Sequence, residues 1–228
     1  MQESERPAGT SSAMTPASSA LARLRAETRA LHEQIEGVVP ILQSGADDAT
    51  YRWYLQKLLG FHRPLEPALF ATPGLAELGI LRVERAKQPW LERDLQALGL
   101  RAEQVQALPD CRPVPVLHGL PGALGCAYVL EGATLGAQLI VRELSPRLPG
   151  VMKQASAYLR CYGTETGMRW RGFSAALERG AVGETERAVL VASARDTFQS
   201  LHRWLEQDST APRVVARSRA LRGRVAHG

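Results

Sequence analysis

The chain has 228 residues, of which 45% are apolar and 22% are charged, and this composition excludes wholesale disorder and suits one domain with a large core. No apolar run approaches the roughly 18 residues that a membrane-spanning helix needs, so we expect no integral membrane protein. The formal net charge is +5, but most of this excess lies near the C-terminus, so the body of the chain lacks the charge of a nucleic-acid binder: Arg213, Arg217, Arg219, Arg222 and Arg224.

All of the predicted elements are helices. Alanine, leucine, arginine, glutamate and glutamine favour helices and dominate the sequence, whereas the alternating β-branched runs that favour strands are missing. The first helix is predicted to begin at Ser18 or Ser19, either of which can act as N-cap, and to end at Gly37.

The second predicted helix carries two prolines near its end. It begins at Asp47 or Asp48 and runs to Leu69. Pro64 and Pro67 lie within its last turns, and because proline lacks a backbone N–H, we expect them to kink or break the end of this helix.

The rest of the chain is predicted to hold short helices followed by longer ones. These lie near residues 82–98, 101–107, 120–144, 149–161, 163–179 and 184–206. We therefore predict an all-α fold, with one multi-helix domain over residues 20–207. A disordered tail (1–19) precedes this domain, and a basic flexible tail (208–228) follows it.

Three cysteines are spread widely over the chain, at Cys111, Cys126 and Cys161. An odd number at such spacing forms neither a disulfide framework nor a cysteine-rich zinc site. Cysteine usage therefore predicts a reduced, cytoplasmic setting.

The stretch LRAETRALHEQIE, residues 24–36, places a histidine beside an apolar stripe. His32 lies at the border of that stripe, and neutral imidazole is a common axial ligand of haem iron. Glu36, one turn later, could accept the other ring N–H and fix the tautomer. Arg25 and Arg29, within two turns before His32, could pair with carboxylates of a bound molecule. A hydrogen-bonded histidine at the edge of the core is the alternative interpretation.

Three glycines lie within an otherwise convincing helix between residues 122 and 144: Gly125, Gly132 and Gly136. Each costs about 1 kcal/mol relative to alanine in a helix interior. Tight packing between helices or a kink could explain them. Alternatively, the backbone must approach something flat and large that a Cβ atom would block. With a histidine on another helix, this pattern indicates a planar macrocycle held between an imidazole and bare backbone.

Several segments of the chain resemble bacterial haem oxygenases, and they occur in the same order as in that family. LRAETRALHEQIE resembles their proximal helix and AYVLEGATLGAQLI their glycine-rich distal helix, and MRWRGFSAAL followed by ARDTF is also similar. The spacing of one further set of residues fits as well: Tyr51, Leu55, Phe61, Leu65 and Glu66. The resemblance covers roughly residues 20–206 and is strongest to the biliverdin-producing branch associated with bacteriophytochromes. It implies a haem-oxygenase-like helical bundle.

The resemblance implies His32 as the proximal ligand of the haem iron. Arg25 would contact a haem propionate, with Arg29 as a weaker candidate in the same helix. Arg171 matches a second propionate-binding arginine, and Phe198 would line the pocket.

The resemblance also assigns the distal side. Gly132 and Gly136 would form a flexible wall that takes part in catalysis by crowding and by backbone hydrogen bonds. Ala133 stands where mammalian members carry aspartate and many bacterial members carry serine, and Ala137 replaces the second glycine of the distal pair.

The activity implied by the resemblance is oxidative cleavage of haem, which is both cofactor and substrate. Biliverdin, carbon monoxide and ferrous iron would be the products, and O2 would be consumed with external reducing equivalents. A ferredoxin or a flavoprotein reductase would supply electrons, and a bacteriophytochrome could accept the bilin. No membrane partner is expected.

One alternative uses the same helices with a different metal. His32, His62, Glu36, Glu66 and Glu131 could serve a non-haem di-iron oxidase. Such sites favour a Glu-x-x-His spacing on helices, and the sequence contains none. The His-x-x-x-Glu spacing occurs, but it is common by chance.

Two further alternatives involve no catalysis. A haem carrier or sensor would hold the ring without degrading it, and Ala133 keeps this interpretation open. A nucleic-acid binder acting through its arginine-rich tail would lose affinity steeply with salt, and deletion of residues 208–228 would abolish its binding. Nucleic acid is not the partner we expect.

Overall fold

The computed structural model describes residues 19–207, and within this range it contains helices and no strands, which confirms the predicted all-α class. The predicted tails, 1–19 and 208–228, lie outside the described residues except for Ser19. In chain order the elements are α1 (Ala20–Val38), η1 (Pro40–Leu42), α2 (Asp48–Phe70), α3 (Arg82–Arg85), α4 (Gln88–Ala97), α5 (Ala102–Gln106), α6 (Gly119–Leu144), α7 (Pro149–Gln154), η2 (Gly163–Glu165), α8 (Thr166–Gly180) and α9 (Glu184–Glu206).

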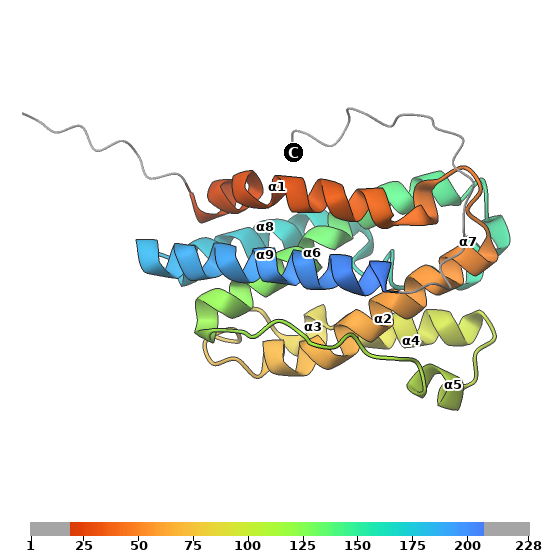
Figure 1. Cartoon of the computed structure of the whole chain (residues 1–228), viewed down its shortest axis with the longest axis horizontal. Helices are drawn as coiled ribbons and strands as arrows, with labels where there is room; N and C mark the ends of the chain where they lie inside the picture. Colours follow the sequence, from red (N-terminus) through yellow and green to blue (C-terminus); the bar gives the residue numbers. More distant parts are fainter. Residues whose placement is uncertain (1–18, 208–228) are drawn as a thin grey trace, which may run out of the picture.

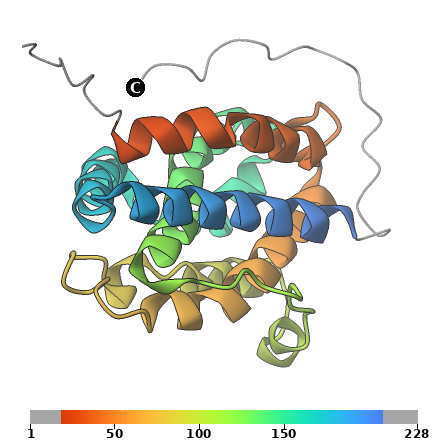
Figure 2. The same ribbon diagram turned by 60° about the vertical axis from the view of Figure 1, so that its left-hand side comes forward.

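The helices are arranged around α6 and α9. In Figure 1, α1 lies along the top, α2 to α5 lie along the bottom, and α6, α8 and α9 lie between them. The view in Figure 2 shows α6 rising behind α9 towards α1. Both α1 and α6 pack against α9, yet the backbones of α1 and α6 make hardly any close approach to each other. The two helices with the predicted site residues are therefore both anchored on α9.

The apolar residues form two neighbouring cores. The first is built by α1, α8, α9 and the first half of α6, together with the end of α2. The second is built mainly by α2, α4, α7 and the last part of α6. Because α6 contributes to both, its position is fixed along most of its length.

Local capping explains where the first two long helices begin. The hydroxyl of Ser19 accepts a hydrogen bond from the backbone N–H of Ala22, and the carboxylate of Asp47 accepts one from that of Thr50. Each bond satisfies an N–H that has no partner within its own helix. Of the predicted N-cap alternatives, the structure selects these two.

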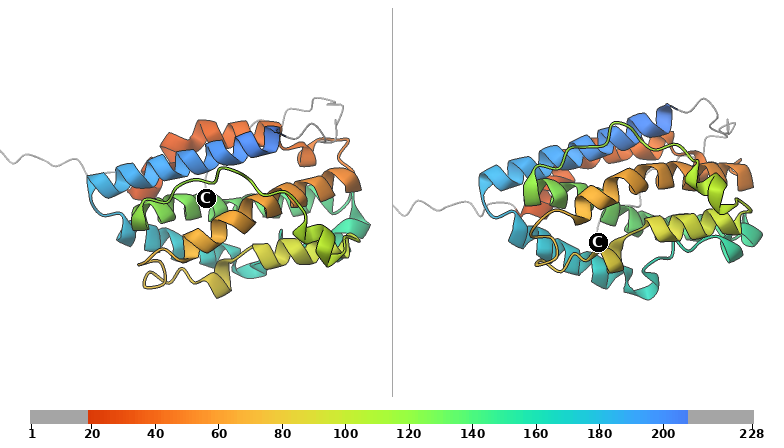
Figure 3. Two further views of the ribbon diagram at one scale, coloured as in Figure 1. Left: turned by 60° about the horizontal axis from the view of Figure 1, so that its bottom comes forward. Right: turned by 90° about the horizontal axis from the view of Figure 1, so that it is seen from below.

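Of the two predicted effects of the prolines on the end of α2, a kink or a break, the break is wrong. The helix continues through Pro64 and Pro67 to Phe70. Pro64 cannot donate to the carbonyl of Gly60, but the backbone N–H of Cys111 takes over that acceptor at 2.8 Å. Cys111 belongs to the long loop before α6, which crosses α2 in Figure 3. A long-range hydrogen bond thus replaces the missing helical one.

The predicted helix over residues 149–161 is too long, because α7 ends at Gln154. The backbone N–H groups of Ala157 and Tyr158 both donate to the carboxylate of Asp94 on α4, each at 2.8 Å. A helical course would direct these N–H groups to carbonyls within the segment instead. The buried aspartate therefore ends α7 and holds the following turn against α4.

Helix α6 is long and apolar enough to cross a membrane by length and composition, and it is the one described helix that passes this test. Half of its most apolar window is buried against the other helices of the fold. An apolar helix at the centre of a bundle has the same composition as a membrane span. All three cysteines are free in the structure, in agreement with the predicted absence of disulfides.

Candidate functional site

His32 lies on the exposed side of α1 and points its ring towards α9. Its side chain is 55% exposed, and Nδ1 lies 3.5 Å from a carboxylate oxygen of Glu36. With Nδ1 directed at a carboxylate, Nε2 is the ring nitrogen that suits a metal. The imidazole also stands edge-on to the buried ring of Phe198, with 6.0 Å between ring centroids. The structure thus brings together two of the predicted pocket residues.

The three glycines of α6 separate into two kinds. A Cβ atom on Gly125 would come closer than 3.0 Å to the backbone carbonyl oxygen of Leu190, so this glycine permits close packing of α6 against α9. A Cβ atom on Gly136 would meet nothing within 4 Å. On Gly132 it would make only an ordinary contact, 4.0 Å from the indole of Trp170. Packing therefore explains Gly125, but it does not explain Gly132 and Gly136.

One pair of side chains lies between α1 and α6. The side chain of Thr28 on α1 is close enough to the hydroxyl of Tyr128 on α6 to oppose the rise in its pKa. His32 lies one turn beyond Thr28, and Gly132 lies one turn beyond Tyr128. Both helices run from left to right in Figure 1. The imidazole and the bare backbone are therefore placed at the same level of two neighbouring helices.

Tyr128 occupies a polar corner between the two helices. Burial raises the pKa of its hydroxyl, and the side chain of Thr28 and the positive charge of Arg25 oppose this shift. Its ring lies 6.0 Å from that of Trp170 on α8. Arg25, predicted to bind a carboxylate, is thus close to a phenolic hydroxyl that can donate to the same kind of group.

The other two predicted arginines, Arg29 and Arg171, have exposed side chains. The guanidinium of Arg29 pairs with Glu33 at 3.1 Å, and both side chains are mostly exposed. Arg171 is exposed on α8, and its Nη1 lies 3.5 Å from the place that a Cβ atom of Gly167 would occupy. Both are free to reorient towards a ligand, because neither is buried.

Sequence patterns alone missed Tyr128 and Trp170. Tyr128 precedes Gly132 by four residues and so shares its face of α6, which is a signal that could have identified it. Trp170 carries no such signal, since its contact with Gly132 joins α8 to α6 and depends on the tertiary fold.

Residues on both candidate helices are open to solvent. Ala133, Leu135 and Gly136 are exposed on α6, and His32 is half-exposed on α1. A surface pocket of about 290 Å3 lies elsewhere, between α4 and the turn after α7, where Trp90 and Arg160 line it. An exposed imidazole on one helix and exposed backbone without side chains on another are the features that the sequence analysis expected beside a flat ligand.

The residues suggested for a di-iron site do not assemble. Within residues 19–207, no group of three histidine, cysteine, aspartate or glutamate side chains could hold a metal ion. His62 is buried and pairs with Glu66 at 2.9 Å, whereas His32 is on a different helix and pairs with Glu36. The geometry therefore gives this alternative no support.

A family model, a curated relative and a solved structure all match this chain, and all three are heme oxygenases. The family model described as heme oxygenase matches residues 18–207. A heme oxygenase from Xanthomonas campestris pv. campestris (strain 8004) is 31% identical over 125 residues, which are 55% of this chain and 70% of that protein. A crystal structure of NO- and CO-bound heme oxygenase from Neisseria meningitidis has a TM-score of 0.63 at 21% identity, covering 84% of this chain and 92% of that one.

Proposed function

The chain belongs to the haem oxygenase family, and on this basis we propose that it binds haem between α1 and α6 and cleaves the ring to biliverdin, carbon monoxide and ferrous iron. The main support for placing haem there is the way in which α1 and α6 are aligned with each other. The side chains of Thr28 and Tyr128 lie close together, and each precedes its candidate residue, His32 or Gly132, by one turn. The space beside Gly136 is free of protein atoms within 4 Å of an added Cβ.

On the proximal side, His32 provides Nε2 to the iron. The carboxylate of Glu36, 3.5 Å from Nδ1, keeps the proton on Nδ1 and so presents the unprotonated nitrogen to the ligand. Phe198 meets the imidazole edge-on and limits its rotation. The bound haem iron supplies the redox chemistry with O2 and external electrons.

At the ring edge, the propionates are held by cations and a phenol. Arg25 carries a positive charge that acts on Tyr128, and Arg171 and Arg29 are exposed, and we assign these side chains to the propionates. Charge-assisted hydrogen bonds to two carboxylates would fix the rotation of the ring in its own plane. That rotation would determine which meso carbon is attacked.

On the distal side, Gly132 and Gly136 let the α6 backbone lie against the ring. Because neither residue has a side chain, the backbone itself would form the wall on this face of the bound ring. Ala133 contributes no polar group, so hydrogen bonding on this side comes from backbone groups and ordered water. This arrangement directs oxidation to the porphyrin edge.

The reaction requires an electron donor and a product acceptor. We assign the first role to a ferredoxin or a flavoprotein reductase and the second to a bacteriophytochrome, both on the strength of the sequence resemblance. The proposed position of haem does not depend on either partner.

Hemin titration of the full chain tests the proposal. We expect a Soret band with saturable binding, and after addition of reductant in air this band should decay to a bilin spectrum. His32→Ala should alter the Soret band and stop turnover. His202→Ala is a matched control, because His202 pairs with Glu206 at 3.2 Å in the same His-x-x-x-Glu arrangement, on α9.

The possible results separate the proposal from its rivals. An unchanged Soret band and turnover in His32→Ala would reject the ligand assignment. A Soret band that persists under reductant and air would identify a haem carrier instead of an enzyme. Absence of saturable hemin binding would reject the haem site altogether.

A further inference from the structure

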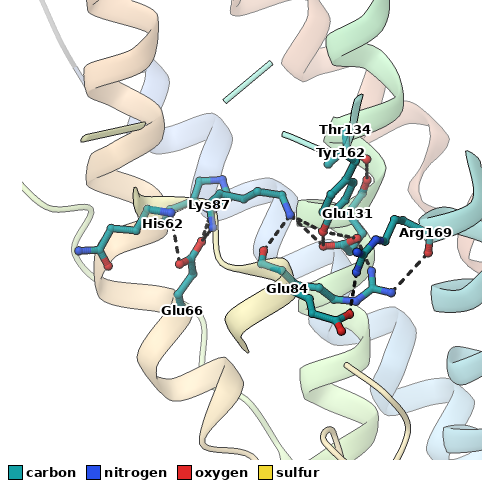
Figure 4. Close-up of polar contacts among 10 residues, drawn as sticks. His62, Glu66, Glu84, Lys87, Glu131, Thr134, Tyr162 and Arg169 are labelled. Carbon is teal, nitrogen blue, oxygen red and sulfur yellow. Dashed lines mark hydrogen bonds and ion pairs between the residues drawn. The ribbon is translucent and has the colours of Figure 1, made fainter. Parts of the chain in front are cut away.

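A buried ion cluster lies directly behind the proposed distal wall. Glu131 immediately precedes Gly132 on α6, and it is only 4% exposed. Figure 4 shows its carboxylate surrounded by side chains from several segments. No step of the proposed function uses these groups, although a buried carboxylate requires strong compensation.

Three donors from outside α6 compensate Glu131. Arg85 Nη1 donates to it at 2.6 Å, Lys87 Nζ at 3.2 Å, and the hydroxyl of Tyr162 at 2.9 Å. Lys87 Nζ also donates to the backbone carbonyl of Arg85 and to the Tyr162 oxygen, at 2.7 and 2.6 Å. All three N–H bonds of this ammonium group are thus used, and the donors converge from both α3–α4 and the segment before η2.

A second buried carboxylate lies beside the cluster. Glu66 on α2 accepts from the backbone N–H of Lys87 at 2.7 Å and pairs with His62 at 2.9 Å. Although burial raises its pKa, these hydrogen bonds outweigh burial, and the pKa of Glu66 is lowered. The charged groups of Arg85 and Lys87 thus both pair with Glu131, whereas Glu66 is held by His62 and by the backbone N–H of Lys87.

Arg85 links this cluster to α8. Its Nη2 donates to the backbone carbonyl of Arg169 at 3.4 Å, and the Arg169 side chain pairs in turn with Glu84 at 2.6 Å. Arg169 immediately precedes Trp170, whose indole faces Gly132. The guanidinium of Arg85 thus binds Glu131, which precedes Gly132, and the carbonyl of Arg169, which precedes Trp170.

A small cavity lies beside Arg85. Glu66, Arg85, Lys87 and Glu131 line it together with apolar side chains, and its volume is about 10 Å3, the lower limit for one water molecule. Arg85 Nε is the one buried side-chain nitrogen or oxygen within residues 19–207 that lacks a hydrogen-bond partner.

We propose that Arg85 is a positioning residue for haem cleavage: by holding Glu131 and the Arg169 carbonyl together, it fixes α6 and α8 around Gly132 and thereby sets the distance of the distal wall from the ring. This inference rests on the proposed haem site for its catalytic meaning. The planar guanidinium can hold both partners at once, whereas an ammonium group cannot take up this forked geometry.

The test replaces Arg85 with lysine, which keeps the buried positive charge but loses the bridge. In the ligand-free protein, we expect hydrogen exchange of the α6 backbone around residues 128–140 to accelerate about two- to tenfold, the effect of losing one hydrogen bond. In the CO-bound ferrous haem complex, the C–O stretching band should shift, since the polarity and position of the distal backbone change.

Arg63→Lys is the matched control. Arg63 also bridges a carboxylate, that of Asp110 at 2.7 Å, and a backbone carbonyl, that of Val105 at 3.1 Å, but it joins α2 to α5 and to the loop before α6. Its loss should accelerate exchange around residues 105–111 and leave both the α6 exchange and the C–O band unchanged.

A further variant keeps the test decisive if Arg85→Lys does not fold. Tyr162→Phe removes one hydrogen bond to Glu131 without changing the charge of the cluster, and it should accelerate the same α6 exchange. The inference is overturned if the variant that folds leaves α6 exchange and the C–O band as in the parent protein. Failure of the parent protein to bind hemin would reject the proposed function, while the exchange data would still report on the anchoring of α6.

Discussion

Alanine at position 136 should stabilise the ligand-free protein and weaken hemin binding at the same time. A Cβ atom on Gly136 meets nothing within 4 Å, so the change brings only the helix-forming advantage of alanine, about 0.8–1.0 kcal/mol. For a domain of this size that gain raises the melting temperature by about 2–4 °C. The same methyl group intrudes on the proposed haem site, and an overpacking cost of about 1–3 kcal/mol weakens hemin binding roughly five- to 150-fold.

Gly125→Ala is the control, because it should destabilise the ligand-free protein. Its Cβ atom would come within 3.0 Å of the Leu190 carbonyl oxygen and at 3.0 Å from the Ala194 nitrogen, and both atoms are backbone. Helix α9 must therefore shift, and we expect a loss of about 1–3 kcal/mol in stability. Thermal unfolding of the ligand-free variants and Soret titration measure both quantities. The reasoning is refuted if Gly136→Ala lowers the melting temperature or leaves hemin affinity unchanged.

Two further predictions concern a cap and the propionate corner. Asp47→Ala should cost about 1 kcal/mol at neutral pH, because its carboxylate caps α2. Hydrogen bonds from Thr50 lower the pKa of Asp47 below 3.8, so this contribution is present above that pH and is lost as the pH falls through the lowered pKa; chemical denaturation against pH measures it. Tyr128→Phe should weaken hemin binding about two- to tenfold in Soret titrations. Tyr51→Phe should not, because the Tyr51 hydroxyl donates to the Ala155 carbonyl in the second core.

The long helices were predictable because their signals are local. The N-caps Ser19 and Asp47 and the apolar stripes of α1, α6 and α9 depend on neighbouring residues alone. The two errors both arise from partners far along the chain. Cys111 replaces the hydrogen bond that Pro64 removes from α2, and Asp94 takes the N–H groups that would have extended α7. No local pattern around residues 64 or 155 contains that information.

The candidate site shows the same division between local and long-range information. A histidine and a glycine-rich helix can be recognised as residue types that suit a flat ligand, but the sequence does not say which glycine faces which neighbour. The assignment of Gly125 to packing requires the position of Leu190, 65 residues further along the chain. The cluster around Glu131 was likewise beyond sequence reasoning, because its donors Arg85 and Tyr162 come from segments that only the fold brings together.

Glu131 marks the boundary between two differently used parts of α6. Before it, Gly125 brings the helix into backbone contact with α9, and a side chain there would act on stability. After it, Ala133, Leu135 and Gly136 are exposed, and side chains there would act on the ligand. The opposite face of that later part stays buried through Ala137 and Leu144 in the second core, so Glu131 adds a polar anchor at the start of a stretch that packs on one face only. The buried carboxylate provides this anchor through donors that lie outside the proposed haem site, so the distal wall can be held without side chains entering the space that the ring requires.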